Sequence, residues 1–155
     1  MKWFNSAEQE IRDYLLPRID SVIRVLQGLT PDSFDYDTAE NNVEVGCLPG
    51  QGLGQEGVAA SVCAVDVERH RVLINMKFFT LPKQGFKYGS KEFNGKDSQL
   101  MTLIHEVTHF NDVAGSKDFY YGSTSSIRYA NAPNSRMNAD NLASYILGFE
   151  NKFPI

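Results

Sequence analysis

Two histidines and a glutamate within five residues constrain this chain more than any other feature. His105 and His109 are four residues apart, so on a helix they share one face, about 6 Å apart along the axis. A zinc ion midway between them would bond one ring nitrogen from each at about 2.0–2.1 Å. Glu106 lies about 100° round the helix, where its carboxylate can take a proton from a zinc-bound water. The spacing H-E-x-x-H is therefore typical of a zinc metalloprotease.

The residues around this motif favour the helix that the geometry needs. Asp97 or Ser98 can cap a helix that begins near Gln99. Gly115 is expected to end it, because glycine adopts the left-handed conformation readily. Apolar residues recur on the side away from the histidines, which predicts that this side packs into a core. They are Leu100, Leu103, Ile104, Val107 and Phe110.

Length and composition limit the classes of protein that fit. A chain of 155 residues is long enough for one domain with a core, and we expect residues 1–155 to form a single domain. The formal charge of −4 gives no electrostatic case for nucleic acid, and no apolar run is long enough to span a bilayer. The first residues lack the apolar centre of a signal peptide, so the chain leaves the cell by another route, stays inside or is a trimmed domain. Cys47 and Cys63 form either one disulfide or a pair of buried thiols.

The first half of the chain predicts a helix followed by short strands. Residues 6–27 have apolar residues at helical spacing, and Pro17 within them predicts a kink or two consecutive helices. Residues 42–48 predict a short strand.

The next segments predict an antiparallel hairpin. Residues 58–65 and 71–79 are rich in β-forming residues, and His70 between them is expected to be a solvated turn residue. Residues 115–137 are expected to be mostly irregular, and a final helix is expected at about 138–150. Together these elements predict a mostly helical α+β fold with a small antiparallel sheet beside the motif helix.

A catalytic zinc site needs a third protein ligand and an open position for water. No histidine follows His109, so the third ligand should be a carboxylate, and Asp112 and Asp118 compete for this position. On a helix, Asp112 would lie about 7–8 Å further along the axis than a zinc ion between the histidines, which is too far. Asp118 follows Gly115, where the chain can turn back toward the metal.

The sequence after the helix carries a second motif. Residues 115–122 read G-S-K-D-F-Y-Y-G and match the pattern G-T-x-D-x-x-Y-G at every fixed position except Ser116. H-E-x-x-H followed closely by this pattern resembles the aspzincins, which include the deuterolysins and the peptidyl-lysine metalloendopeptidases. Residues 138–140 resemble the N-A-D segment that opens the last helix of that family, and residues 74–79 resemble its strand before the metal helix. The resemblance extends over residues 71–146 and implies a zincin-like fold.

The resemblance implies a metal site and a catalytic base. His105, His109 and Asp118 would bind one zinc ion per chain, and Glu106 would be the general base. The implied reaction is hydrolysis of peptide bonds within a protein or peptide substrate.

The resemblance also implies residues that contact the substrate. Tyr121 would lie near the metal and hold the substrate or stabilise the tetrahedral intermediate. Asp140 would line the subsite for the residue after the cleaved bond and favour a basic side chain there, and it can also cap the last helix. Family members that prefer lysine have a glutamate three residues later, where this chain has Ala143, so the expected preference is mild.

Two functions of different classes follow from these motifs. The first is a zinc endopeptidase acting outside the producing cell, either as the mature part of a secreted enzyme or as a delivered protease toxin. An inhibitor or immunity protein would then be a natural partner. The second is a non-catalytic binding module in which zinc only holds the fold. The intact Glu106 argues against this second function, because a purely structural zinc site does not need it.

Overall fold

The computed structural model describes residue 4 and residues 9–47, 57–84 and 96–150, with the side chains of residues 149 and 150 excepted. The start of the predicted first helix, residues 6–8, therefore lies outside the described residues.

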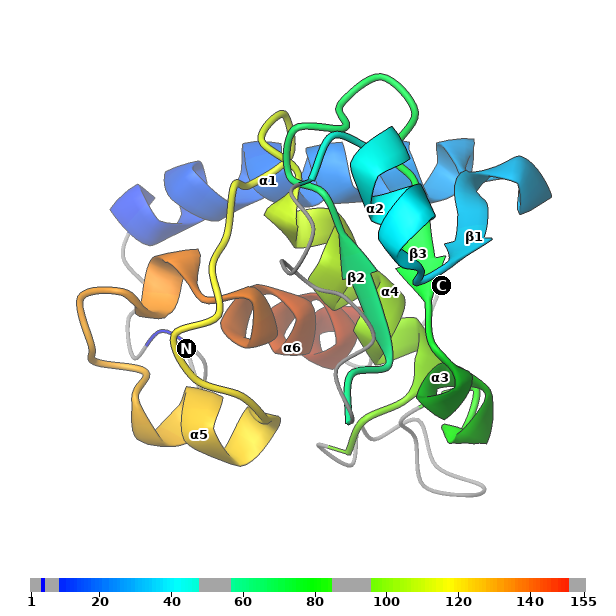
Figure 1. The fold of residues 1–155 in the computed structure, drawn as a ribbon. Coiled ribbons are helices and arrows are strands. Elements are labelled where there is room, and N and C mark those ends of the chain that lie inside the picture. Colours follow the sequence, from blue (N-terminus) through cyan, green and yellow to red (C-terminus); the bar gives the residue numbers. More distant parts are fainter. Residues whose placement is uncertain (1–3, 5–8, 48–56, 85–95, 151–155) are drawn as a thin grey trace.

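Helices α1 (Gln9–Gly28) and α6 (Ala139–Glu150) and a small sheet pack against the motif helix. The motif helix is α4 (Gln99–His109), which contacts α1, α6 and strand β2 (Ala60–Val62). Figure 1 shows α4 in the middle of the molecule, with α1 across one end, α6 beside it and β2 in front. The expected α+β fold, mostly helical with a small sheet beside the motif helix, is confirmed.

Helix α1 is one continuous helix, although Pro17 lies inside it. Of the two alternatives that the sequence left open, a kink or two consecutive helices, the second is therefore wrong. Its buried side chains recur at helical spacing on both sides of the proline, so packing stabilises both halves as one element. They are Ile11, Leu15, Val22 and Val25. The following turn is the 3₁₀ helix η1 (Pro31–Ser33).

The sheet has three strands in the order β1-β3-β2. Strand β2 pairs antiparallel with β3 (Val72–Ile74), which confirms the predicted hairpin in a shorter form. Strand β1 (Phe34–Tyr36) was not predicted, and it pairs parallel with β3. The sheet is therefore mixed and not purely antiparallel. All three residues of β3 are buried, as expected for its central strand.

Two predicted strands are helices. Residues 42–48 were predicted as a strand, but α2 (Ala39–Glu44) occupies this region, and the Thr38 hydroxyl caps it by accepting the Asn41 N–H at 3.2 Å. Val43 is 54% exposed and Val45 is buried, so the spacing of the two valines does not mark one face of a strand.

The second correction concerns residues 74–79, which resemble a strand of the family. The strand ends at Ile74, and Met76–Thr80 form helix α3. Asn75 separates the two, and its side chain donates to Asp37 at 2.9 Å. This side-chain hydrogen bond joins Asn75, directly after β3, to Asp37, directly after β1.

His70 is not a solvated turn residue. Its backbone is left-handed, with φ of 50°, and only 14% of its side chain is exposed. Its Nε2 lies 3.0 Å from Asp112 Oδ1, and its ring packs edge-on against Phe110 at 4.7 Å between centroids. His70 therefore joins the hairpin turn to the segment that follows the motif helix.

The segment after the motif helix is more regular than expected. Helix α4 ends at His109 and not near Gly115, which instead closes a turn by donating its N–H to the Phe110 carbonyl at 3.0 Å. Gly115 does adopt the expected left-handed backbone, with φ of 56°. Two short helices, α5 (Ser123–Arg128) and η2 (Ser135–Met137), interrupt the stretch that was expected to be irregular. The final helix, α6, is confirmed.

Cys47 and Cys63 form a disulfide, which decides between the two alternatives that the sequence left open. It joins the end of the α2 region to the residue after β2. Among the described helices, none has the length and apolar character needed to cross a bilayer.

Candidate metal centre

Helix α4 presents the motif residues to one side and packs its other side into the core. Ser98 is the cap, as its Oγ accepts the Met101 N–H at 3.1 Å, which decides between the two predicted caps. Ile104 and Val107 are buried among residues of α1 and α6. The helix is thus anchored from behind, and this packing fixes the direction in which His105 and His109 point.

The ligand atoms of the two histidines and one aspartate converge. His105 Nε2 lies 3.2 Å from His109 Nε2 and 3.1 Å from Asp118 Oδ1, and His109 Nε2 lies 3.5 Å from the same oxygen. Ligands about 2.0–2.1 Å from a zinc ion at tetrahedral angles are about 3.3–3.4 Å apart. The three residues therefore fit a zinc ion, and within the described residues they are the group with metal-binding spacing.

Hydrogen bonds on the far side of each ring leave both Nε2 atoms free to bind a metal. His105 Nδ1 donates to Asp140 Oδ1 at 2.6 Å, and His109 Nδ1 donates to the Ser116 carbonyl at 3.0 Å. A carboxylate and a carbonyl only accept, so Nδ1 of each ring carries a proton, and a metal would bind through the lone pair of Nε2. Such partners fix ring orientation and raise ligand basicity in metal sites.

Ser116 was treated only as the mismatch in the second motif, but it contacts the metal-binding helix. Its hydroxyl lies 2.6 Å from the Thr108 hydroxyl and 3.2 Å from His109 Nδ1, and its side chain is buried. Threonine, the family residue here, carries the same hydroxyl, so the substitution preserves the hydrogen-bonding group. Its place directly after Gly115 was the signal that could have identified it.

Glu106 is buried beside the ligands without joining them. Its Oε1 lies 4.0 Å from His105 Nε2, and only 11% of its side chain is exposed. Burial raises the pKa of its carboxyl group to about 8. The positive charge of His105 acts in the opposite direction but is the smaller effect. The neighbouring carboxylates of Asp118, Asp140 and Asp37 raise the pKa further. Glu106 is therefore a stronger proton acceptor than an exposed glutamate.

Asp118 lies on the loop opposite the helix, with 30% of its side chain exposed. Burial would raise the pKa of its carboxyl group, but the hydrogen bond and charge of His105 outweigh it, so the pKa is lowered. Tyr121 hydrogen-bonds to Asp118, and its ring stacks on His105 at 6.3 Å between centroids. Burial and the charge of Asp118 raise the pKa of Tyr121 to about 12, so its hydroxyl keeps its proton.

Asp112 lies apart from the three ligand residues. Its carboxylate binds His70 and, at 3.3 Å, Arg24 of α1. It follows the end of α4, so its position no longer continues the histidine face of the helix.

Asp140 is placed behind His105. Its Oδ1 accepts from His105 Nδ1, and its Oδ2 accepts a short hydrogen bond from the Gly122 N–H. Its side chain is 10% exposed and lines the cleft in front of the site. Ala143, one turn later on α6, is completely buried in the core.

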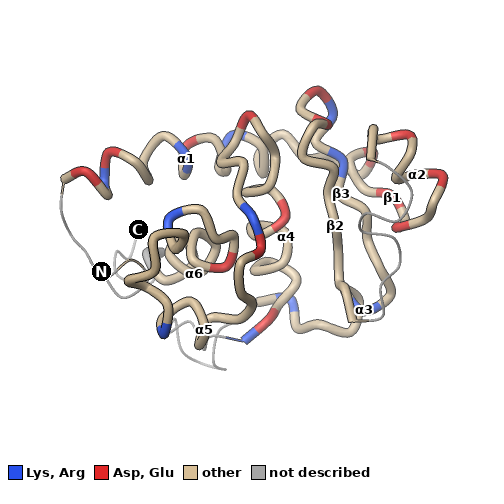
Figure 2. The backbone as a smooth tube through the Cα atoms, turned by 60° about the vertical axis from the view of Figure 1, so that its left-hand side comes forward, with Lys and Arg blue, Asp and Glu red and all other residues tan. Residues whose placement is uncertain are grey.

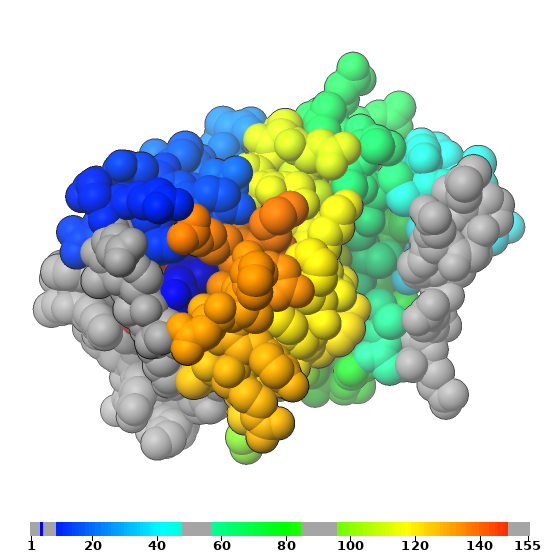
Figure 3. All heavy atoms as spheres, turned by 90° about the vertical axis from the view of Figure 1, so that its left-hand side faces the viewer, coloured from blue at the N-terminus to red at the C-terminus, as the bar shows by residue number. Residues whose placement is uncertain are grey.

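The site opens into a cleft of about 1030 Å³. One side, here named the ligand wall, is residues 116–122. The other, named the strand wall, is residues 58–65 around β2. Figure 3 shows the ligand wall within the yellow and orange surface between α1 and the sheet, and Figure 2 shows that β2 carries no charged residue. Such a cleft, with polar groups converging at its base, is typical of an active site.

The fold is mostly helical with a small sheet, and two histidines of one helix and an aspartate form a candidate metal site beside a buried glutamate. These features are typical of a zincin-type metallopeptidase. The family described as lysine-specific metallo-endopeptidase, the aspzincins, matches residues 1–146. The chain therefore belongs to this family of metallo-endopeptidase hydrolases, and the family implies a zinc cofactor.

The proteins similar to this chain include an extracellular protease and a zinc peptidase of known structure. A stretch of 71 residues is 37% identical to an extracellular protease of Aeromonas hydrophila, and it spans 41% of this chain but only 20% of that protein. A zinc peptidase from Grifola frondosa has a similar structure, with a TM-score of 0.65 and 23% identity. That match covers 94% of this chain and 73% of the other, and it confirms the zincin-like fold.

Proposed function

We propose that this protein is a zinc-dependent endopeptidase. His105, His109 and Asp118 hold one zinc ion per chain, and Glu106 acts as the general base. The observation that carries the proposal is the near-tetrahedral spacing of the three ligand atoms, 3.1–3.5 Å, beside a buried carboxylate in an open cleft.

A bound zinc ion would supply Lewis-acid polarisation of the scissile carbonyl and a lowered pKa for a coordinated water. Glu106 takes a proton from the attacking water and returns it to the nitrogen of the leaving amine. Burial favours its taking up the proton, because it raises the pKa of the carboxyl group above that of an exposed glutamate. Asp140 and Ser116 hold the histidine rings during the reaction through the Nδ1 hydrogen bonds.

Tyr121 holds the substrate or stabilises the oxyanion. Tyr121 is 68% exposed and lines the cleft, and its hydroxyl group hydrogen-bonds to Asp118. A phenol with a raised pKa keeps its proton; in the metal-free structure Asp118 accepts it, and turning it from Asp118 to the substrate would supply the donor that a developing oxyanion needs.

Asp140 gives the substrate site a mild preference for a basic residue after the cut. It lines the cleft, and each carboxylate oxygen has a second lone pair besides the one used by His105 or Gly122. The family description, lysine-specific, supports this direction. Because Ala143 is buried and uncharged, no second acid comes from that position.

A structural zinc site, the alternative function, is less well supported. Structural zinc ions have four protein ligands in a closed site. Here three ligand residues face a cleft, and Glu106 stands beside them at 4.0 Å without contributing to the group.

The decisive experiment is digestion of a denatured protein, with cut sites mapped by mass spectrometry. Wild-type protein should cleave, and the same protein with a chelator should not, with activity restored by added zinc. Glu106→Gln is the matched control, because it keeps the ligands and removes the base. Equal cleavage by Glu106→Gln and wild-type protein would reject the proposal.

We also propose that residues 1–155 act as one catalytic domain outside the producing cell, either secreted or delivered as a toxin. The Cys47–Cys63 disulfide supports an oxidising environment, and the similar Aeromonas hydrophila protein is extracellular. Free-thiol titration of the protein recovered outside the producing cells tests this setting, and free thiols at Cys47 and Cys63 contradict it.

A further inference from the structure

We propose that Asn138 is a positioning residue that holds Asp118 in place for the metal. The inference rests on the proposed zinc site and concerns how that site is built. Two of the ligands sit on a helix, whose backbone hydrogen bonds fix them. Asp118 sits on a loop, so its position depends on contacts from elsewhere in the chain.

Asn138 supplies such contacts through one side-chain oxygen. Its Oδ1 accepts the N–H groups of Phe119 and Tyr120, the two residues directly after Asp118, at 3.0 and 3.2 Å. The asparagine is completely buried, and its Nδ2 donates to Asn141 Oδ1 at 3.0 Å. This donation fixes the amide orientation that points Oδ1 toward the loop.

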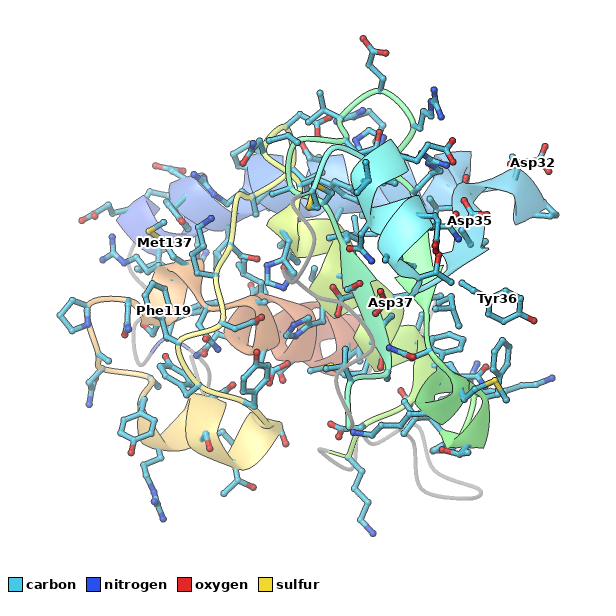
Figure 4. All side chains as sticks on the ribbon, viewed as in Figure 1. Asp32, Asp35, Tyr36, Asp37, Phe119 and Met137 are labelled. Carbon is cyan, nitrogen blue, oxygen red and sulfur yellow. A yellow bond between two sulfur atoms is a disulfide. The ribbon has the colours of Figure 1, made fainter. Side chains whose placement is uncertain are left out.

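Backbone contacts hold the residue before Asp118 to the same segment. Lys117 donates its N–H to the Met137 carbonyl at 2.8 Å, and its own carbonyl accepts from the Ala139 N–H at 3.0 Å. Figure 4 shows Phe119 and Met137 in the region where the two segments meet. Asp118 is therefore bracketed on both sides, and only the bonds on the Phe119 side depend on a side chain that substitution can remove.

Removing the Asn138 side chain leaves two partly buried N–H groups of the loop without this acceptor. The loop then loses the contacts that define its path next to Asp118, and the geometry of the carboxylate relaxes. Loss of an outer-shell partner typically weakens metal affinity by about 10–100-fold. We expect an effect of this size for Asn138→Ala.

The test is a double-mutant cycle read out as zinc affinity. Zinc is titrated against a competing chelator in wild-type protein, Asn138→Ala, Asp118→Ala and the double variant, and thermal unfolding of each zinc-free protein is recorded. If Asn138 acts through Asp118, Asn138→Ala lowers zinc affinity about 10–100-fold when Asp118 is present. The same substitution lowers zinc affinity much less in the Asp118→Ala background. An equal loss in both backgrounds, or no loss, overturns the inference.

Asn42→Ala is the matched control. Asn42 is an equally buried asparagine that donates to Asp37 and the Thr38 carbonyl, and it is remote in sequence from the loop. The zinc affinity of Asn42→Ala should stay within about twofold of wild type even if its stability falls, because mutations at sites that share no partners act independently. If Asn42→Ala lost as much zinc affinity as Asn138→Ala, any destabilisation of the fold would weaken zinc binding, and the inference would be overturned.

Two further variants keep the test decisive. Asn138→Asp retains an accepting oxygen at the same reach but replaces the Nδ2 donor to Asn141 by a second oxygen; zinc affinity above that of Asn138→Ala supports the role of the accepting oxygen, and an equal loss with unchanged thermal unfolding contradicts it. If Asn138→Ala does not fold, Asn138→Ser replaces it in the cycle, since serine suits the residue before a helix but is too short to reach both N–H groups. A wild-type protein that binds no zinc would overturn the proposed function itself, whereas zinc binding without any Asn138 effect overturns only this inference.

Discussion

The two walls of the cleft are built in different ways. The ligand wall is a loop that carries Asp118 and Tyr121, and it is tied to the start of α6 by backbone and side-chain hydrogen bonds. The strand wall is uncharged in sequence from Val58 to Val65, and pairing with β3 and a disulfide hold it. One wall places individual reactive atoms, and the other presents the regular backbone of an edge strand.

This difference predicts separate consequences for damage to each wall. Changes in the ligand wall should alter zinc affinity and catalysis at nearly constant stability. Changes in the strand wall should alter stability while a folded protein still binds zinc. The base of the cleft, where α4 lies between the walls, should respond most strongly of all.

Glu106→Gln should cause the largest loss. The variant keeps the size of the side chain and the three ligands but cannot accept a proton, so kcat should fall by about 10²–10⁴-fold. Zinc content, measured by metal analysis, should remain one per chain, because Glu106 lies outside the ligand group. A variant that loses both zinc and activity would show that Glu106 is a ligand instead.

Asp118→Ala should have the second-largest effect, and Asp112→Ala is its control. Removing a direct ligand should lower zinc affinity by more than about 100-fold, which is the largest loss typical for residues that only contact a ligand. Asp112→Ala loses its contacts with His70 and Arg24 and should bind zinc nearly as well as wild type. Competition titration of both folded variants decides the point, and zinc release from Asp112→Ala alone would reverse the assignment of the third ligand.

Replacing both Cys47 and Cys63 with serine should act on the strand wall. The disulfide closes a loop with a sequence separation of 16, and its loss should lower the free energy of unfolding by about 2–4 kcal/mol. Chemical denaturation measures this change. Zinc affinity of the folded variant should stay near that of wild type, so a large drop would show that the two walls are coupled.

The smallest effect should be in cleavage preference. Asp140 is expected to enrich lysine or arginine at the position after the cut only mildly, because His105 and Gly122 already engage its carboxylate. Mapping several hundred cut sites in a denatured proteome would measure the enrichment. No enrichment of lysine or arginine at that position would remove Asp140 from the substrate site and leave only its contacts with His105 and Gly122.

The parts of the fold that could be predicted depend on neighbours in sequence. A helix cap at Asp97 or Ser98, the apolar face of α4 and the extent of α6 all follow from local spacing. The parts that were misread depend on contacts between distant segments. Strand β1 has only three residues, and its pairing with β3 joins Phe34 to Val72, so no local pattern marks it.

His70 is another example of a long-range contact. Nothing in the hairpin sequence indicates that its ring binds Asp112, 42 residues later. In the same way Asp140 lies 35 residues after His105, and only folding shows that its carboxylate orients that ring.

The sequence by itself determined which groups are proposed to do the chemistry. A pair of histidines at helical spacing, a glutamate between them and an aspartate after Gly115 follow from residue types and from the geometry of one helix and one turn. Tertiary structure decided how those groups are held. Asp140 and Ser116 behind the histidines, Asn138 behind the loop of Asp118, and the disulfide on the strand wall all join distant segments. Side-chain chemistry is local to a residue, whereas the position of an atom to within a bond length requires packing from several segments at once.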